Sequence, residues 1–231
     1  MPTQQAIHEH VVRNMRNELT LILFLVFATL TKSANATGQY PDAIVIDGKE
    51  YSIKGNPLEK YFEKYPEKKP KTNIMSSALH RGYIATFTFA NEKLYLIDIK
   101  IKVKKENSDK NWETEMVSVF NKVFPNENKV LMDLYSGILI IHLNLEESYE
   151  NRNRLLIEFE NGVAQEKRTY GNKKYQNFLD VQFELYKKTD KYKNEFKELK
   201  KNDDGEEEYD DDFIEGIMRT YTPNFTSKFS D

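Results

Sequence analysis

The sequence of 231 residues contains no cysteine, one tryptophan and four histidines. Without cysteine, the chain can form no disulfide, no thiolate nucleophile and no cysteine-ligated metal site. His8 and His10 belong to an N-terminal segment with the features of a signal peptide, which leaves His80 and His142 for the rest of the chain. Two histidines cannot build a multi-histidine metal centre, and no metal or other cofactor is expected.

Recognisable catalytic motifs are also missing. The chain has no phosphate-binding loop, no dinucleotide fingerprint, no Gly-x-Ser-x-Gly elbow and no His-Glu-x-x-His pair. Paired carboxylates do occur, but 37 aspartates and glutamates place two of them together somewhere by chance. The sequence therefore favours a protein that is not an enzyme, and it leaves the question open.

Long hydrophobic runs are scarce, and the one clear run covers residues 19–30. Basic residues precede this run, and a small-residue pattern that ends at Ala36 follows it. The three-part order predicts a secretory signal peptide over residues 1–36, because twelve apolar residues are too few to span a bilayer comfortably. Met15, which stands just before the run, is a candidate for the true start of translation.

Cleavage of this segment predicts an exported protein, periplasmic or secreted, and the lack of cysteine fits a bacterial cell envelope. The alternative is that the segment is not cleaved and that residues 19–30 anchor the chain in a membrane. The membrane is then a partner through this segment alone.

Alternating apolar residues predict the centre of a β-sheet. Residues 83–89 and residues 95–103 each show a period of two in β-branched and aromatic side chains. The polar break over residues 90–93 is short enough to join the two strands as an antiparallel hairpin. The rest of the chain is expected to cover this hairpin.

Further strands follow from turn chemistry. The pairs Asp47-Gly48 and Asn161-Gly162 accept the positive φ angles of tight turns, and they predict hairpins over residues 43–53 and 154–170. Residues 134–143 are apolar on both faces, which is typical of a strand in the middle of a sheet.

Helical spacing of apolar residues predicts helices over residues 57–65, 112–123 and 173–201, and a last helical turn over residues 213–218. The third helix is long. Its apolar stripe consists of Phe178, Leu185, Tyr192 and Leu199. We expect this stripe to pack on the sheet.

These elements predict a single α+β domain over residues 37–201. Its mostly antiparallel sheet has about seven strands, with short helices and one long C-terminal helix. Residues 202–231 form an acidic, loosely ordered tail in this prediction, since eight of the ten residues from Asp203 to Asp212 are acidic. A solvated link is the expected state of this run, and a site for a cation or a basic partner is the alternative.

Polar residues at the entry to the central hairpin are the candidate binding site. His80, Arg81 and Tyr83 stand together before the first strand, and Asp98 lies on the facing strand. We expect Arg81 to pair with Asp98, either as a structural pair that fixes the register or as part of a site that His80 assists. His142 follows an apolar run and is expected to be a strand histidine with satisfied hydrogen bonds.

The distribution of charge argues against nucleic acid as a partner, because the lysines are spread along the chain and the aromatic residues alternate into the predicted core. Residues 173–201 carry mixed charge, whereas a helix that lies on a membrane surface needs a basic face. We expect a monomer whose partner, if it has one, is another protein.

Two stretches resemble an uncharacterised family of bacterial proteins. The first has the pattern R-G-Y-x-A-x-F followed by L-Y-L-x-D-I, over residues 81–99. The second has the pattern Y-S-G-x-L followed by S-Y-E, over residues 135–150. The resemblance covers residues 40–188 and implies a shared fold without an established activity. This chain carries His80 and Leu134 where the family tends to carry tryptophan.

The sequence thus predicts an exported, non-enzymatic protein of a bacterial cell envelope that binds another molecule. Two alternatives stay open. One is an envelope hydrolase with a site near His80, Arg81 and Asp98, and the other is a signal-anchored membrane protein.

Overall fold

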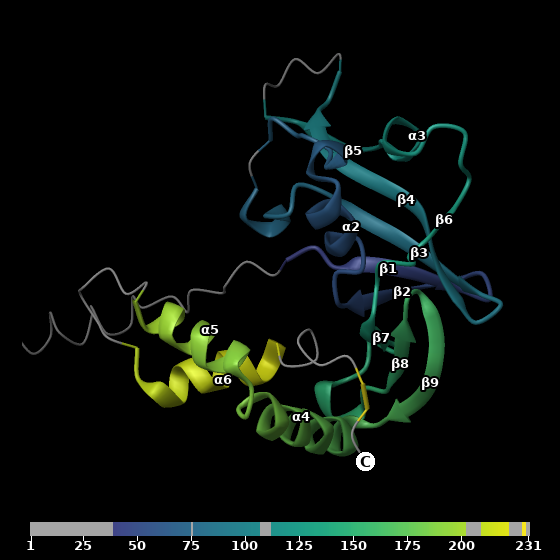
Figure 1. The fold of residues 1–231 in the computed structure, drawn as a ribbon. Helices are drawn as coiled ribbons and strands as arrows, with labels where there is room; N and C mark the ends of the chain where they lie inside the picture. Colours follow the sequence, from purple (N-terminus) through teal and green to yellow (C-terminus); the bar gives the residue numbers. More distant parts are fainter. Residues whose placement is uncertain (1–38, 75, 107–111, 202–208, 222–227, 230–231) are drawn as a thin grey trace, which may run out of the picture. The chain divides into compact units, whose positions relative to one another are not determined.

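The computed structural model describes residues 39–74, 76–106, 112–201, 209–221 and 228–229, which are drawn in colour in Figure 1. The predicted signal peptide, residues 1–36, lies outside the described residues, and so does most of the acidic run from Asp203 to Asp212. Within the described part, no helix is both long and apolar enough to cross a membrane.

Nine strands of this part form one sheet with the order β3-β1-β2-β7-β8-β9-β4-β5, and β6 pairs with β4 beside this path. The strands are β1 (Asp42–Ile46), β2 (Lys49–Lys54), β3 (Ile84–Ala90), β4 (Lys93–Lys104), β5 (Thr114–Ser118), β6 (Val130–Leu131), β7 (Gly137–His142), β8 (Arg154–Glu160) and β9 (Val163–Tyr170). Among these pairings, only that of β1 with β3 is parallel. The predicted α+β class and mostly antiparallel sheet are confirmed, and β5 and β6 add to the seven predicted strands.

Strand β4 is the centre of the sheet, as its sequence predicts. It pairs with β3, β5, β6 and β9. Its hairpin with β3 turns at Asn91 and Glu92, whose φ angles are 52° and 57°. Because β3 also pairs with β1, the order of the strands returns to β4, and the sheet curls around one of its faces.

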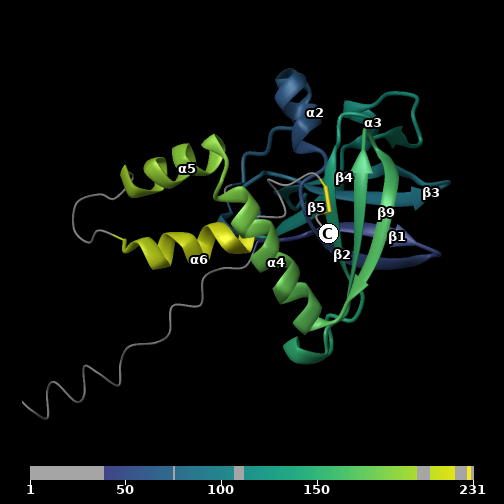
Figure 2. The same ribbon diagram turned by 60° about the horizontal axis from the view of Figure 1, so that its bottom comes forward.

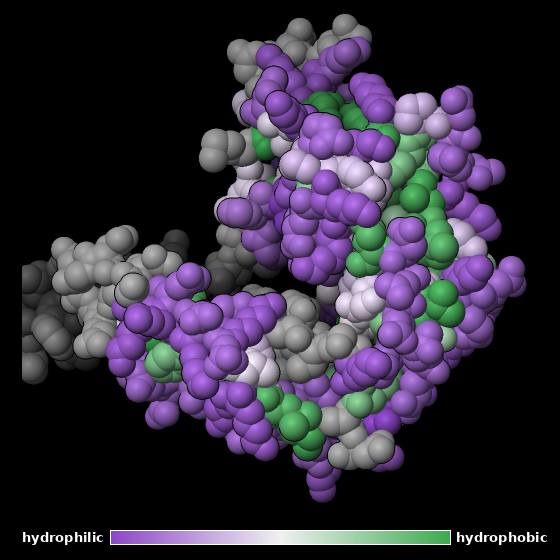
Figure 3. Space-filling model, in the orientation of Figure 1, coloured by the Kyte–Doolittle hydropathy of each residue, from purple (hydrophilic) through white to green (hydrophobic). Residues whose placement is uncertain are grey.

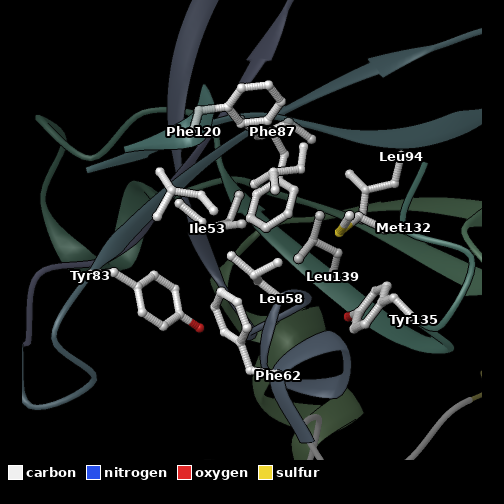
Figure 4. Packing of buried hydrophobic residues seen from close by; sticks show 14 of the residues in the cluster. Ile53, Leu58, Phe62, Tyr83, Phe87, Leu94, Phe120, Met132, Tyr135 and Leu139 are labelled. Carbon is white, nitrogen blue, oxygen red and sulfur yellow. The ribbon is translucent and has the colours of Figure 1, made fainter. Parts of the chain in front are cut away.

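The enclosed face of the sheet carries the main apolar core (Figure 4). Four different strands contribute fully buried residues, among them Ile44, Leu94, Leu139 and Ile157. Helix α2 (Glu59–Lys64) adds Phe62, whose ring centre lies 5.3 Å from that of Tyr83. Alternate residues of a strand point to the same face, so the period of two in the sequence becomes one apolar surface.

The opposite face of β7 and β8 carries a second apolar cluster. Helix α4 (Asn172–Tyr186) lies beside β9 (Figure 2). Its residues Tyr175, Phe178 and Leu179 pack on Ile138, Ile140 and Leu156 of the sheet. Helices α5 (Asp190–Lys201) and α6 (Asp211–Tyr221) follow, and residues Ile214 and Met218 of α6 pack on α4.

The predicted helix over residues 112–123 is wrong. Residues Thr114–Ser118 form strand β5, and the short helix α3 covers only Phe120–Val123. Strand β4 is twelve residues long, and one of its edges pairs with β5 over residues 100–104. That edge is not visible in the local sequence, and Met116, which suggested a helical stripe, is exposed.

The predicted long helix over residues 173–201 is also wrong, because α4 and α5 are separate helices. Thr189 lies between them and accepts the amide N–H of Tyr192 at 3.1 Å, while its hydroxyl donates to the carbonyl of Tyr186 at 2.7 Å. A threonine that bonds the backbone in this way caps a new helix. Leu185, a member of the predicted stripe, is exposed.

Other sequence predictions are confirmed with changed bounds. Helix α2 begins at Glu59 within the predicted residues 57–65, and the two predicted hairpins are β1–β2 and β8–β9. The predicted central strand begins at Gly137 and pairs with β2 and β8 on its two edges. Helix α6 covers eleven residues where the sequence predicts one turn.

Two glycines in equivalent turns provide a test of the packing around β8 and β9. Gly48 and Gly162 have φ angles of 77° and 74°, but only at Gly162 would a Cβ atom meet a neighbour, the carbonyl oxygen of Met132 at 2.6 Å. We expect Gly48→Ala to lower the free energy of unfolding by about 1 kcal/mol, through backbone strain alone. Gly162→Ala should lower it by about 3 kcal/mol or more, because the backbone of residue 132 must also move.

Urea unfolding of the two variants and of the unchanged chain measures both losses. Equal losses would show that the contact between residues 162 and 132 does not constrain the turn.

Candidate functional site

A pocket of about 500 Å³ opens where β1 begins and β2 ends. Its walls are residues 39–42, residues 52–56, His80, Arg81 and His142. The pocket therefore contains two of the residues that the sequence predicts for a binding site, His80 and Arg81. It lies at the ends of strands and in the turn before β3, which places polar and charged side chains around an opening.

Arg81 is held by a buried carboxylate. Its Nη1 and Nη2 atoms donate to the two carboxylate oxygens of Asp42 at 2.7 and 2.9 Å, and the Asp42 side chain is fully buried. The amide of Ala85 donates to the same carboxylate at 2.8 Å. This two-pronged pair ties the start of β1 to the start of β3.

The predicted pair between Arg81 and Asp98 is wrong. Asp98 accepts a hydrogen bond from the hydroxyl of Ser118 at 2.6 Å and lies 3.7 Å from the ammonium of Lys100. Arg81 precedes β3, and the parallel neighbour β1 brings Asp42 to it. The parallel pairing of two strands far apart in the sequence left no local signal.

Tyr83 is a structural residue of the core. Its side chain is fully buried, and its hydroxyl donates to Glu59 of α2 at 2.6 Å. Burial and the bond to Glu59 raise the pKa of the Tyr83 phenol. Lys69 lies 3.3 Å from the other carboxylate oxygen of Glu59, so the candidate residue Tyr83 belongs to a network behind the pocket.

His142 lines the pocket, although the sequence places it outside the candidate binding site. The prediction that its hydrogen bonds are satisfied is wrong, because its Nδ1 atom is buried and has no hydrogen-bond partner within the described residues. Its neighbour across the β7–β8 ladder is Arg154. Only the pairing of these two strands reveals that a histidine and an arginine stand side by side.

Arg154 is a buried cation, with a side chain that is only 2% exposed. Its guanidinium lies 4.3 Å from the ring centre of Tyr175 and 5.5 Å from that of Tyr149, and Nη1 donates to the carbonyl of Arg152 at 3.2 Å. Among the described residues no carboxylate pairs with Arg154, and its Nε atom has no hydrogen-bond partner. Buried charges are usually paired, so among the described residues the positive charge of Arg154, next to His142 in the ladder, is not balanced by a carboxylate.

This charge acts on the pocket. Burial, followed by the positive charges of Arg154 and Lys54, lowers the pKa of His142 from 6.5 to about 4. Arg152 contributes in the same direction. Burial, and then Arg154, also lower the pKa of Lys54. His142 is therefore neutral at neutral pH, and a negative charge in the pocket would be stabilised by the side chains around it.

The arrangement suits binding better than catalysis. Asp42, the one buried carboxylate of the pocket, already accepts hydrogen bonds from Arg81 and from the amide of Ala85. It is therefore not available as a general base. Within the part that the structure describes, no three histidine, aspartate or glutamate side chains are grouped to hold a metal ion. What remains is a set of hydrogen-bond donors and cations around an opening.

Comparison of the chain with models of protein families, with curated proteins and with solved structures finds no match in any of the three. The resemblance to a family of bacterial proteins therefore stays a prediction.

The low pKa of His142 predicts a pH dependence of stability. Between pH 6.5 and about 4 the unfolded chain binds a proton at this residue and the folded chain does not. The free energy of unfolding should therefore fall as the pH is lowered through this window, because the unfolded state binds more protons. His142→Gln removes this contribution and should flatten that part of the pH profile.

Urea unfolding across the window measures the profile of each chain. His80→Gln is the matched control, since it removes an exposed histidine from the same pocket. Identical profiles for the unchanged chain and for H142Q would contradict the prediction.

Proposed function

We propose that the chain is a non-enzymatic binding protein whose pocket beside His142 holds an anionic group, a carboxylate or a phosphate, of its ligand. The observation that carries this proposal is the buried Arg154, which has no carboxylate partner among the described residues. An isolated charge in an apolar environment is unfavourable, and a counter-charge nearby relieves that cost. The proposal supplies this counter-charge from the ligand.

The field of Arg154 reaches the pocket. Arg154 faces His142 directly in the ladder and lowers the pKa of both His142 and Lys54, which line the pocket. A bound anion would be attracted by these cations and would accept hydrogen bonds from nearby donors. Ser52 and Asn56 in the same walls provide further donors.

The surface agrees with a charged ligand. Most of the coloured face in Figure 3 is hydrophilic, with smaller hydrophobic areas between hydrophilic residues. Lysine, arginine, aspartate and glutamate make up 31% of the sequence. A ligand that carries charge meets such a surface without burying a large apolar area.

A titration with inorganic phosphate tests the proposal. We expect phosphate to shift the ring resonances of His142 in nuclear magnetic resonance spectra and to raise its pKa above about 4, because the bound anion offsets the positive field. Lys54→Gln should weaken phosphate binding about tenfold, which corresponds to about 1.4 kcal/mol. The control is Lys64→Gln, which removes an exposed lysine of α2 outside this pocket.

Two outcomes would overturn the proposal. One is that the His142 resonances do not change at any phosphate concentration that leaves the chain folded. The other is that K64Q weakens binding as much as K54Q, which would indicate only general attraction of anions.

The proposal also includes export, which is supported by the sequence of residues 1–36 alone. We expect a chain expressed in a bacterial host from its own start to be cleaved after Ala36 and to leave the cytoplasm. Intact mass and cell fractionation measure this. A chain that begins at Thr37 outside the cytoplasm agrees with export, whereas a full-length chain in the membrane fraction would make residues 19–30 an anchor.

A further inference from the structure

The last described residues, Lys228 and Phe229, lie on the outer face of β8 and β9. The amide N–H of Phe229 donates to a carboxylate oxygen of Glu158 at 2.7 Å. Its ring centre lies 4.4 Å from the guanidinium carbon of Arg168 and 5.9 Å from the ring centre of Phe178, which it meets at 63°. We infer that Glu158, Arg168 and Phe178 form a peptide-binding slot, and that Phe229 of the same chain occupies it as an internal ligand.

Glu158 is the residue that most needs this explanation. It is only 8% exposed and lies on the same face of β8 as Leu156, beside the apolar cluster under α4. Among the described residues, its one hydrogen-bond donor is the amide of Phe229. A buried carboxylate without a hydrogen-bond partner destabilises the fold. A peptide N–H that donates to Glu158 offsets this cost.

The contacts with Phe229 are of three kinds. A backbone N–H meets a charged acceptor, a cation lies over the face of the ring, and a second ring meets it edge to face. Each kind is favourable, and together they distinguish an aromatic residue from an aliphatic one. The slot therefore favours a peptide with a phenylalanine or tyrosine at this position.

The slot is held in place by its own neighbours. Arg168 donates to Glu166 at 2.5 Å, which fixes the guanidinium over the ring of Phe229. Phe178 belongs to α4, the helix that packs on the sheet. The site is thus built from two strands and a helix, and it does not depend on a loop to form.

Helix α6, which precedes Phe229 in the sequence, is fixed on α4. Arg219 near the end of α6 bonds Asp180 of α4 at 2.6 Å, so this end of α6 is fixed on the helix that lines the slot. Helix α6 ends at Tyr221, seven positions before Lys228 in the sequence. A ligand attached through so short a segment has a high effective concentration, and a peptide from another protein must compete with it.

A labelled peptide tests the inference on full-length chains. The probe is a fluorescent peptide with the sequence of residues 222–231, T-P-N-F-T-S-K-F-S-D. We expect a chain with Phe229→Ala to bind the probe at least about tenfold more tightly than the unchanged chain, because its slot is no longer filled by its own ring. A probe with alanine in place of the phenylalanine at position 229 should not bind.

Matched variants assign the binding to the slot. Glu158→Gln, added to F229A, should weaken probe binding about tenfold, because the charged acceptor becomes neutral. Arg168→Lys, also added to F229A, serves as a second test, since it keeps the charge and loses the planar group over the ring. Phe213→Ala, which removes an exposed phenylalanine of α6, should behave as the unchanged chain does.

Circular dichroism of each chain confirms that it is folded before the titration. The inference is overturned if the folded F229A chain does not bind the probe, or binds it no better than the unchanged chain. It is also overturned if neither E158Q nor R168K changes the affinity.

Discussion

The parallel pairing of β1 with β3 is the constraint on which the rest of the fold depends. Every other pairing among the described strands is antiparallel, and these alone would leave an open sheet. The pairing is fixed by Asp42, a fully buried carboxylate that bonds both arms of Arg81 and the amide of Ala85. Removing one partner of such a pair leaves a buried charge uncompensated, which typically costs about 3–5 kcal/mol. The ion pair therefore specifies how the sheet closes.

Closure gives the two faces of the sheet different chemistry. The enclosed face is covered by aliphatic and aromatic residues that form the main core. The outer face of β7 and β8 instead carries His142, Arg154 and Glu158 beside the second apolar cluster. Helix α4 covers only part of that face. Both proposed binding sites use charged side chains of this outer face, because a charge buried without a partner in the apolar core would be costly.

Local patterns in the sequence were enough for much of this fold. Alternation and the turn pairs Asp47-Gly48 and Asn161-Gly162 predicted the hairpins, since both signals act between neighbouring residues. The parallel pairing, strand β5 and the partner of Arg81 depend on residues far apart in the sequence and were missed or wrong. Half of the candidate site was predicted, since His80 and Arg81 line the pocket. The role of His142 depends on its neighbour Arg154 across the β7–β8 ladder, which the local sequence does not show.

Strand β8 explains why two separate partners are needed. Its outer face carries Arg154 and Glu158, a cation and an anion that are both buried. Four residues of extended strand separate them by about 13 Å, which is too far for an ion pair. Each charge therefore needs a partner from outside the strand. Glu158 has one, the amide of Phe229, and Arg154 has aromatic rings and a carbonyl but no carboxylate among the described residues. The same strand thus presents one charge that is matched by the chain itself and one that a bound anion would match.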